Sequence, residues 1–227
     1  MPLFTLLKAI AYKESIKTRH SIILLTLFNI AVLFWNFLTV RRLFMLDHSE
    51  VVWYRVMDLG QVPYTGISMI PPITALIFCS VQFLLEMRDA RIRISLHTPC
   101  DSSIMVLAHA FYGLFFLTLL FALDALLLFF AMHHYFPVEV ALSAVKDTLP
   151  WFVSGLFVYL GGCFVLLEPQ VKRKALGFIL FGGMCCPLYL YGSAGFYSCI
   201  IIYFALCIPF MFLTMALPAD DYRNRWS

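Results

Sequence analysis

The sequence predicts an all-α membrane protein with six transmembrane helices and both termini on the cytoplasmic side. Hydrophobic residues make up 62% of the 227 positions and charged residues only 13%. About 20 helical residues cross a hydrocarbon core of about 30 Å, and soluble helices rarely sustain apolar runs of that length. The polar segments between the runs are too short to fold as soluble domains. The six apolar runs are residues 21–40, 67–85, 104–132, 149–167, 175–191 and 197–217.

Residues 1–20 are predicted to form an amphipathic helix in the cytoplasmic membrane interface. The lysines of this segment are offset from its apolar residues, as in interfacial helices. The alternative is a basic leader that only sets the topology. Residues 21–217 then form the six-helix domain and residues 218–227 a cytoplasmic tail. The apolar residues that recur at helical spacing are Leu3, Leu6, Leu7 and Ile10.

The distribution of basic residues predicts the orientation of the chain. Of the 16 Lys and Arg residues, twelve fall on one side of the spans and four on the other. Cytoplasmic loops are enriched in Lys and Arg, so the side with twelve is expected to be cytoplasmic. The twelve are Lys8, Lys13, Lys17, Arg19, Arg88, Arg91, Arg93, Lys172, Arg173, Lys174, Arg223 and Arg225. The four are Arg41, Arg42, Arg55 and Lys146.

The second and fifth spans depart from plain helical sequence. Pro71 and Pro72 in the second remove backbone donors and predict a kink. The fifth is short and contains Gly183 and Pro187, so it is expected to be broken or to re-enter from the outer face. Interrupted spans often line transport pathways, whereas the alternative is that the glycines allow close helix packing.

The third span carries the titratable residues of the apolar region. Asp124 is interpreted as a pathway or proton-relay carboxylate, or as a residue that snorkels or bonds to a neighbouring helix. His109 is expected to be a packing residue. His133 and His134 point about 100° apart on a helix, so we expect interfacial residues rather than ligands of one metal. The cysteines form no zinc-like spacing, and no metal site is predicted.

The cytoplasmic segment between the second and third spans has the features of a short rigid elbow. Glu86 ends the span, and a basic stretch with Arg88, Arg91 and Arg93 follows. A Thr-Pro turn at Pro99 and an N-cap residue then lead into the third span. The alternative is an ordinary solvated loop.

This segment resembles the permeases of type-2 ABC exporters. The resemblance rests on Glu86, the basic stretch and Ser95-Leu96-x-x-Pro99, although Ala90-Arg91 stands where the family has Gly-[Ser/Thr]. The Lys13-Glu14 pair before the first span is similar to that family's interfacial helix. A weaker similarity, over residues 186–192, is to the haem-exporter-like membrane subunit of cytochrome c maturation.

The resemblance implies a transport function shared with other polypeptides. Glu86, Arg88, Arg91, Arg93, Leu96 and Pro99 would face an ATPase subunit. Asp124, Pro71, Pro72, Gly183 and Pro187 would belong to the transport pathway. The chain has no P-loop motif, so ATP and Mg would be bound by the partner and no cofactor by this chain. A second permease copy or a paralogue would complete the pathway in a bacterial inner membrane.

Two other classes of function remain open from the sequence. An intramembrane enzyme would use His109, Asp124 or His133 as acid and base groups, but no catalytic pair or H-E-x-x-H motif is present. A scaffold or assembly subunit is the third class. We expect no catalytic residues in this chain, the lipid bilayer as its surroundings, and no nucleic-acid partner. The substrate is open among lipids, peptides, haem-related cargo and drugs.

Overall fold

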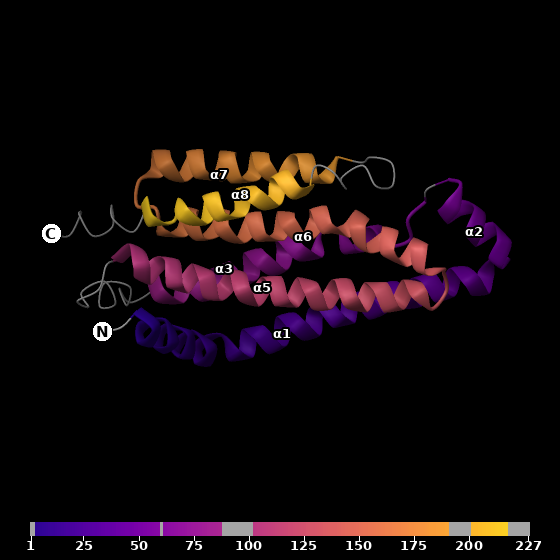
Figure 1. The fold of residues 1–227 in the computed structure, drawn as a ribbon, viewed down its shortest axis with the longest axis horizontal. Coiled ribbons are helices and arrows are strands. Elements are labelled where there is room, and N and C mark those ends of the chain that lie inside the picture. The colour runs from indigo at the N-terminus through magenta and orange to yellow at the C-terminus, as the bar shows by residue number, and fades with distance from the viewer. Residues whose placement is uncertain (1–2, 60, 88–101, 191–200, 218–227) are drawn as a thin grey trace.

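The computed structural model describes residues 3–59, 61–87, 102–190 and 201–217. Over these residues the protein is an all-α bundle (Figure 1) of seven α-helices and two 3₁₀ turns. The helices are α1 (Leu3–Leu46), α2 (Ser49–Met57), α3 (Ile70–Met87), α5 (Ser102–His133), α6 (Val138–Leu167), α7 (Val171–Cys185) and α8 (Ile201–Leu213). The 3₁₀ turns are η1 (Thr65–Ile67) and η3 (Cys186–Tyr189).

Four segments are long and apolar enough to cross a membrane: α1, α3 together with η1, α5 and α6. The helices predicted over the first four apolar runs are therefore confirmed. The last two helices are shorter, with 15 residues in α7 and 13 in α8. That α7 and α8 complete two further crossings stays a prediction.

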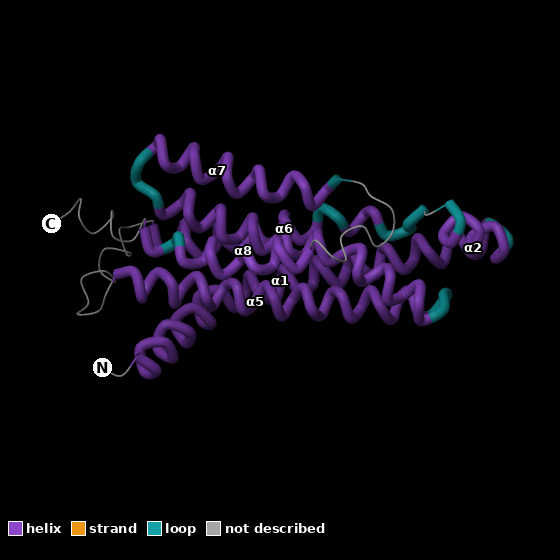
Figure 2. The backbone as a smooth tube through the Cα atoms, turned by 45° about the horizontal axis from the view of Figure 1, so that its top comes forward, coloured by secondary structure: helices purple, strands orange, loops and turns teal. Residues whose placement is uncertain are grey.

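The first helix is longer than the predicted span because it includes most of the predicted interfacial segment. α1 has 44 residues, and its first turns run at an angle to the remainder (Figure 2). Ile10 is buried and Leu7 is exposed, so the apolar residues of this segment do not share one environment. One face of α1 is buried along the bundle, at Ile10, Glu14, Thr18, Leu25, Asn29, Leu33, Asn36 and Val40.

The helix α6 begins eleven residues before the predicted fourth span, at Val138 rather than residue 149. Ala141, Ala144 and Thr148 are buried at helical spacing, while Lys146 on the opposite side is exposed. This mixed composition hides the helix from a search for uninterrupted apolar runs. Pro137 precedes its first turn, where proline's fixed φ and missing N–H are tolerated.

Prolines affect the second and fifth spans differently. The predicted kink at Pro71 and Pro72 is wrong, because both prolines lie in the first turn of α3, where their missing N–H groups have no intrahelical partner to lose. In the segment predicted as the fifth span, the α-helix ends before the predicted end of the span at residue 191. The helix α7 ends at Cys185 and continues as the 3₁₀ turn that contains Pro187. Re-entry of this span stays a prediction.

The helix α6 is the centre of the bundle. It packs against α3, α5, α7 and α8, and α1 covers α3 and α5. The helices α1, α5 and α7 begin, and α3, α6 and α8 end, at one end of the bundle (Figure 1). We call this the basic end, because Lys8 to Arg19 of α1 and Lys172 to Lys174 of α7 lie there. That the basic end faces the cytoplasm stays a prediction.

Candidate functional site: a buried ionic network at the basic end

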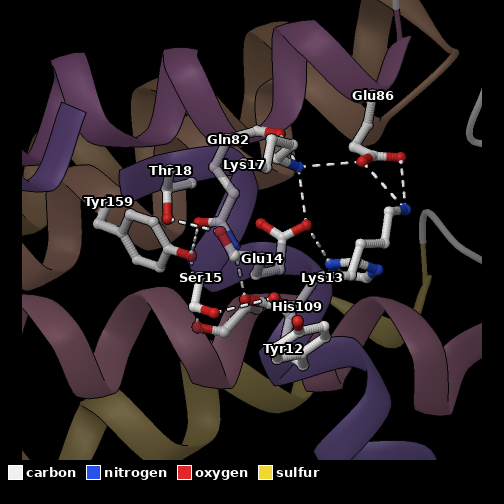
Figure 3. Close-up of polar contacts among 11 residues, drawn as sticks. Tyr12, Lys13, Glu14, Ser15, Lys17, Thr18, Gln82, Glu86, His109 and Tyr159 are labelled. Carbon is white, nitrogen blue, oxygen red and sulfur yellow. Dashed lines mark hydrogen bonds and ion pairs between the residues drawn. The ribbon is translucent and has the colours of Figure 1, made fainter. Parts of the chain in front are cut away.

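Three charged or polar residues of α1 face the other helices of the bundle. Glu14 and Thr18 are fully buried, and the Lys17 side chain is only 17% exposed. The Lys17 ammonium lies 2.7 Å from Glu14 Oε1 (Figure 3). Thr18 donates its hydroxyl hydrogen to the Glu14 carbonyl oxygen at 2.7 Å. The first turns of α1 therefore present an ion pair to the bundle interior.

The last turns of α3 supply the second carboxylate. Lys17 Nζ lies 3.0 Å from Glu86 Oε1 and also donates to the carbonyl oxygen of Gln82 at 3.0 Å. Lys13 Nζ lies 3.1 Å from the same Glu86 oxygen, but its side chain is 48% exposed. Lys17 thus joins Glu14 on α1 to Glu86 on α3, while Lys13 adds a partly solvated contact at the rim.

His109 on α5 and Tyr159 on α6 extend the network to four helices. His109 Nδ1 lies 3.1 Å from Glu14 Oε1. This is an ion-pair distance, although the two groups are not aligned for a hydrogen bond. The Gln82 amide donates to the His109 carbonyl oxygen, and the Tyr159 hydroxyl donates to Gln82 Oε1, each at 2.8 Å. Gln82 therefore connects α3 to both α5 and α6 (Figure 3).

The helices α5 and α6 approach each other closely at Gly113, and the absence of a Cβ atom there leaves space for these contacts. A Cβ atom at Gly113 would overlap the Tyr159 hydroxyl and would lie 2.6 Å from Gln82 Oε1. Real Cβ atoms essentially never approach other atoms that closely. Gly113 is therefore required for Tyr159 to reach Gln82.

The charges of the network are balanced but unevenly solvated. Lys13 and Lys17 compensate Glu14 and Glu86, while Glu14 Oε2 is buried without a hydrogen-bond partner. Burial by itself raises the pKa of Glu86, but the hydrogen bonds and charge of Lys17, and then of Lys13, hold this pKa below its usual range. A buried pair is costly to break, because removing one partner leaves an uncompensated charge.

The network lies beside the predicted elbow. Glu86 is one residue from the end of α3, and α5 begins at Ser102. The elbow connects the end of α3 to the start of α5, and the network holds these two helices together. Glu86 was predicted to face an ATPase, and its side chain is 9% exposed and faces α1. The other predicted ATPase-facing residues, Arg88, Arg91, Arg93, Leu96 and Pro99, lie outside the described residues.

The predicted pathway residues do not gather at the network. Asp124 is 2% exposed, and its Oδ1 has no hydrogen-bond partner. A Cβ atom at Gly183 would meet nothing within 4 Å, so packing does not require that glycine. By contrast, a Cβ atom at Gly177 would lie 2.6 Å from the Phe164 ring, as the close-packing alternative expects.

The histidines at the far end of α5 pack against aromatic rings. His133 stacks on Phe129 with ring centroids 5.7 Å apart. His134 contacts Phe37 at 6.1 Å and Tyr135 at 4.7 Å. Among the described residues, no group of three His, Cys, Asp or Glu side chains is placed to hold a metal ion.

Sequence reasoning missed most of the network. The sequence predicts that Lys13 and Lys17 lie in the membrane interface, and it predicts no role for Gln82 or Tyr159. A usable signal was present, since Ile10, Glu14 and Thr18 recur at every fourth residue and share one helical face. A carboxylate on the face that continues into Leu25 of the apolar span indicates a buried partner.

Comparisons of this chain with protein-family models, curated proteins and solved structures find no match.

Proposed function

We propose that this chain is the membrane-spanning permease subunit of an ABC-type exporter. A separate ATPase subunit would bind ATP and Mg, and a second copy or a paralogue would complete the pathway. In this proposal α7 and α8 are the fifth and sixth crossings, both termini are cytoplasmic, and the membrane is the bacterial inner membrane. Substrate then moves outward when the ATPases close.

The observation that carries the proposal is the buried network at the basic end. Lys17 contacts Glu14 of α1 and both Glu86 and Gln82 of α3, and His109 brings in the start of α5. A force applied to residues 88–101 acts on the ends of α3 and α5, and the network transmits it to α1. An ordinary solvated loop would need no such buried connection between the helices it joins.

The layout of the chain supports a role that depends on partners. The described helices leave no soluble domain, and the sequence contains no G-x-x-x-x-G-K-[ST] motif for binding nucleotide phosphates. In this proposal the energy for transport comes from the separate ATPase subunit. The orientation rule assigns the basic residues of α1 and α7 to the cytoplasm. These residues lie at the same end of the bundle as the end of α3 and the start of α5, which the elbow connects.

The structure gives the enzyme alternative little support. His109 and Asp124 are fifteen residues apart on α5, which separates them by about 22 Å along the helix axis. They cannot serve as acid and base on one substrate. His133 lies farther along the same helix and stacks on Phe129.

The proposal is tested by reversing the charge of the elbow. Arg91→Glu with Arg93→Glu is expected to lower co-purification of a nucleotide-binding protein by at least tens-fold, because docking charges contribute a few kcal/mol in total. The matched control is Arg41→Glu with Arg42→Glu, an exposed pair near the end of α1. The control should retain the partner.

Two results would reject the exporter proposal. One is that no nucleotide-binding protein co-purifies with the wild-type chain. The other is that the elbow variant keeps its partner and substrate-stimulated ATP hydrolysis at normal abundance. Equal loss of the partner in the control variant would show that the effect is not specific to the elbow.

A further inference from the structure

The exposed charges at the basic end of the bundle are of one sign. Over the described residues, this end has seven Lys or Arg residues and three carboxylates. All three carboxylates, Glu14, Glu86 and Glu168, are buried. The exposed surface that these residues form is therefore positive. The seven basic residues are Lys8, Lys13, Lys17, Arg19, Lys172, Arg173 and Lys174.

The far end of the bundle carries charges of both signs. Its described part has four basic and five acidic residues, and none of the five acidic residues is buried. An anion that approaches the far end therefore meets carboxylates as well as cations. The four basic residues are Arg41, Arg42, Arg55 and Lys146, and the five acidic residues are Asp47, Glu50, Asp58, Glu139 and Asp147.

The first turns of α1 present a stripe of basic and apolar side chains to the surroundings. Lys8, Tyr12, Ile16 and Arg19 recur at intervals of three or four residues, so they share one helical face, and all four are exposed. We call these four residues the outer stripe. Neither of its two cations has a carboxylate partner among the described residues. This face differs from the one that the sequence predicts for membrane contact, which includes the buried Ile10.

The ionic network fixes the direction in which the outer stripe faces. Lys17 lies within ion-pair distance of Glu14 and of Glu86 on α3, and Thr18 is buried beside them. These residues hold one face of the first turns of α1 against the bundle, so the outer stripe faces away from it. A helix that is already held in place loses little conformational freedom when its exposed face binds a ligand.

A second basic segment lies at the same end, on the other side of the bundle. The helix α7 begins at the basic end, and both views place it across the bundle from the first turns of α1 (Figures 1 and 2). Lys172 is exposed, and the exposed Leu176 and Phe178 follow it. On α1, the exposed Arg19 is likewise followed by the exposed Ile23. On both sides, the exposed side chains therefore change from basic to apolar with distance from the basic end.

We infer that the outer stripe of α1 and the start of α7 bind the headgroups of anionic phospholipids. A bilayer surrounds the bundle and reaches both segments, and its headgroups meet its acyl chains where the exposed side chains change from basic to apolar. The negative charge of the headgroups complements Lys8, Arg19 and Lys172. Tyr12 and Ile16 suit the boundary between headgroups and acyl chains. The inference concerns the lipid around this chain and does not depend on an ATPase partner.

Lipid binding to the full-length protein in a neutral detergent tests the inference. Phosphatidylglycerol and phosphatidylcholine with identical acyl chains are titrated separately, and bound lipids are counted by native mass spectrometry. One Lys or Arg at a membrane surface raises the affinity for anionic lipid about fivefold, so we expect phosphatidylglycerol to bind at least about tenfold more tightly than phosphatidylcholine. Raising the ammonium acetate concentration from about 0.05 M to about 0.5 M should reduce this preference at least threefold, because salt screens exposed charges.

A triple variant locates the binding surface. Lys8→Gln, Arg19→Gln and Lys172→Gln together remove exposed cations from both segments, so the affinity for phosphatidylglycerol should fall at least about tenfold. The affinity for phosphatidylcholine should stay within twofold of the wild type. All three side chains are exposed, and circular dichroism checks that the variant is folded.

The matched control removes three exposed cations from the far part of the bundle. Arg41→Gln, Arg42→Gln and Lys146→Gln together change the net charge by the same amount. Because carboxylates share this part of the surface, the control should keep its affinity for phosphatidylglycerol within twofold of the wild type. Glycerol 3-phosphate serves as the soluble competitor, and it should not displace phosphatidylglycerol at equal concentration.

Three results would overturn the inference. The first is equal affinity of the wild type for the two lipids at low salt, which would leave this surface to a partner other than anionic lipid. The second is displacement of phosphatidylglycerol by glycerol 3-phosphate at equal concentration, which would make the surface a site for soluble phosphate compounds. The third is an equal loss of affinity in the two triple variants, or no loss in either. The wild-type titrations decide the first two even if a variant does not fold.

Discussion

Replacing Lys17 with methionine removes the ammonium group on which the network depends and keeps much of the apolar stem. The substitution leaves Glu14 fully buried and Glu86 almost so, without the cation that lies within 3.0 Å of both. Breaking a buried ion pair in this way typically costs about 3–5 kcal/mol. His109 still lies 3.1 Å from Glu14, and Lys13 lies 3.1 Å from Glu86, so we expect a loss of about 3 kcal/mol.

Lys13→Met is the matched control, because Lys13 contacts the same Glu86 oxygen from a more exposed position. Its side chain is 48% exposed, compared with 17% for Lys17, and exposed ion pairs contribute about 1 kcal/mol or less. The assay is the free energy of unfolding in mixed micelles of a mild detergent and SDS, followed by circular dichroism. The double variant Lys17→Met with Glu14→Gln should recover part of the loss, since it removes the unpaired charge.

Equal losses for Lys17→Met and Lys13→Met would refute this reasoning, because they would show that Lys17 is as well solvated as Lys13. A double variant that is less stable than Lys17→Met alone would show that Glu14 is held by contacts other than its charge.

Three further predictions use the same unfolding assay. The pKa of Glu86 is lower in the folded protein than its ordinary value of 4.5. The stabilisation that ionised Glu86 gives the folded state is therefore present above about pH 4.5 and is lost as the pH falls through the pKa of Glu86 in the folded protein. Glu86→Gln should reduce the loss of unfolding free energy at acid pH, whereas the same change at the exposed Glu50 should not. Gly113→Ala should cost about 1–3 kcal/mol by forcing Tyr159 away from Gln82, and an unchanged stability would contradict the close approach. Gly177→Ala should destabilise the protein, because the added Cβ atom would press on the Phe164 ring. Gly183→Ala, with open space around it, should stabilise α7 by about 0.5–1 kcal/mol. The opposite order of stabilities would contradict the packing of α7.

Hydropathy was sufficient to predict α1, α3, α5 and most of α6, because long apolar runs have few alternatives to membrane helices. It could not predict which face of each helix is buried. The helix α5 is apolar on all sides, so Leu119 at 61% exposure and Leu117 at 0% look alike in the sequence. Helical periodicity identifies a buried face only where polar residues mark the other one, as in the first twelve residues of α6.

The polar residues that sequence reasoning undervalued are those with partners on distant segments. Lys17 is 69 residues from Glu86, and Tyr159 is 77 residues from Gln82. Lys17, which turns inward, differs locally from Arg19, which is exposed, only in lying three residues after Glu14. The distinction depends on the angle at which α1 crosses α3, and this angle follows from the packing of the whole bundle. Asp124 attracts notice in the sequence because a carboxylate within an apolar run is unusual, but its burial to 2% exposure depends on the helices that pack against α5.

The two buried polar sites differ in what holds their charge. At the basic end Glu14 and Glu86 have the two lysines as counter-charges, so the charges of the network are balanced and the network is suited to hold helices together. Asp124 is 2% exposed, and its Oδ1 has no hydrogen-bond partner; a lone charge at the centre of a membrane helix costs about 2.5–3.5 kcal/mol. The first site therefore favours one fixed arrangement of α1, α3 and α5, whereas Asp124 Oδ1 supplies no such connection between helices.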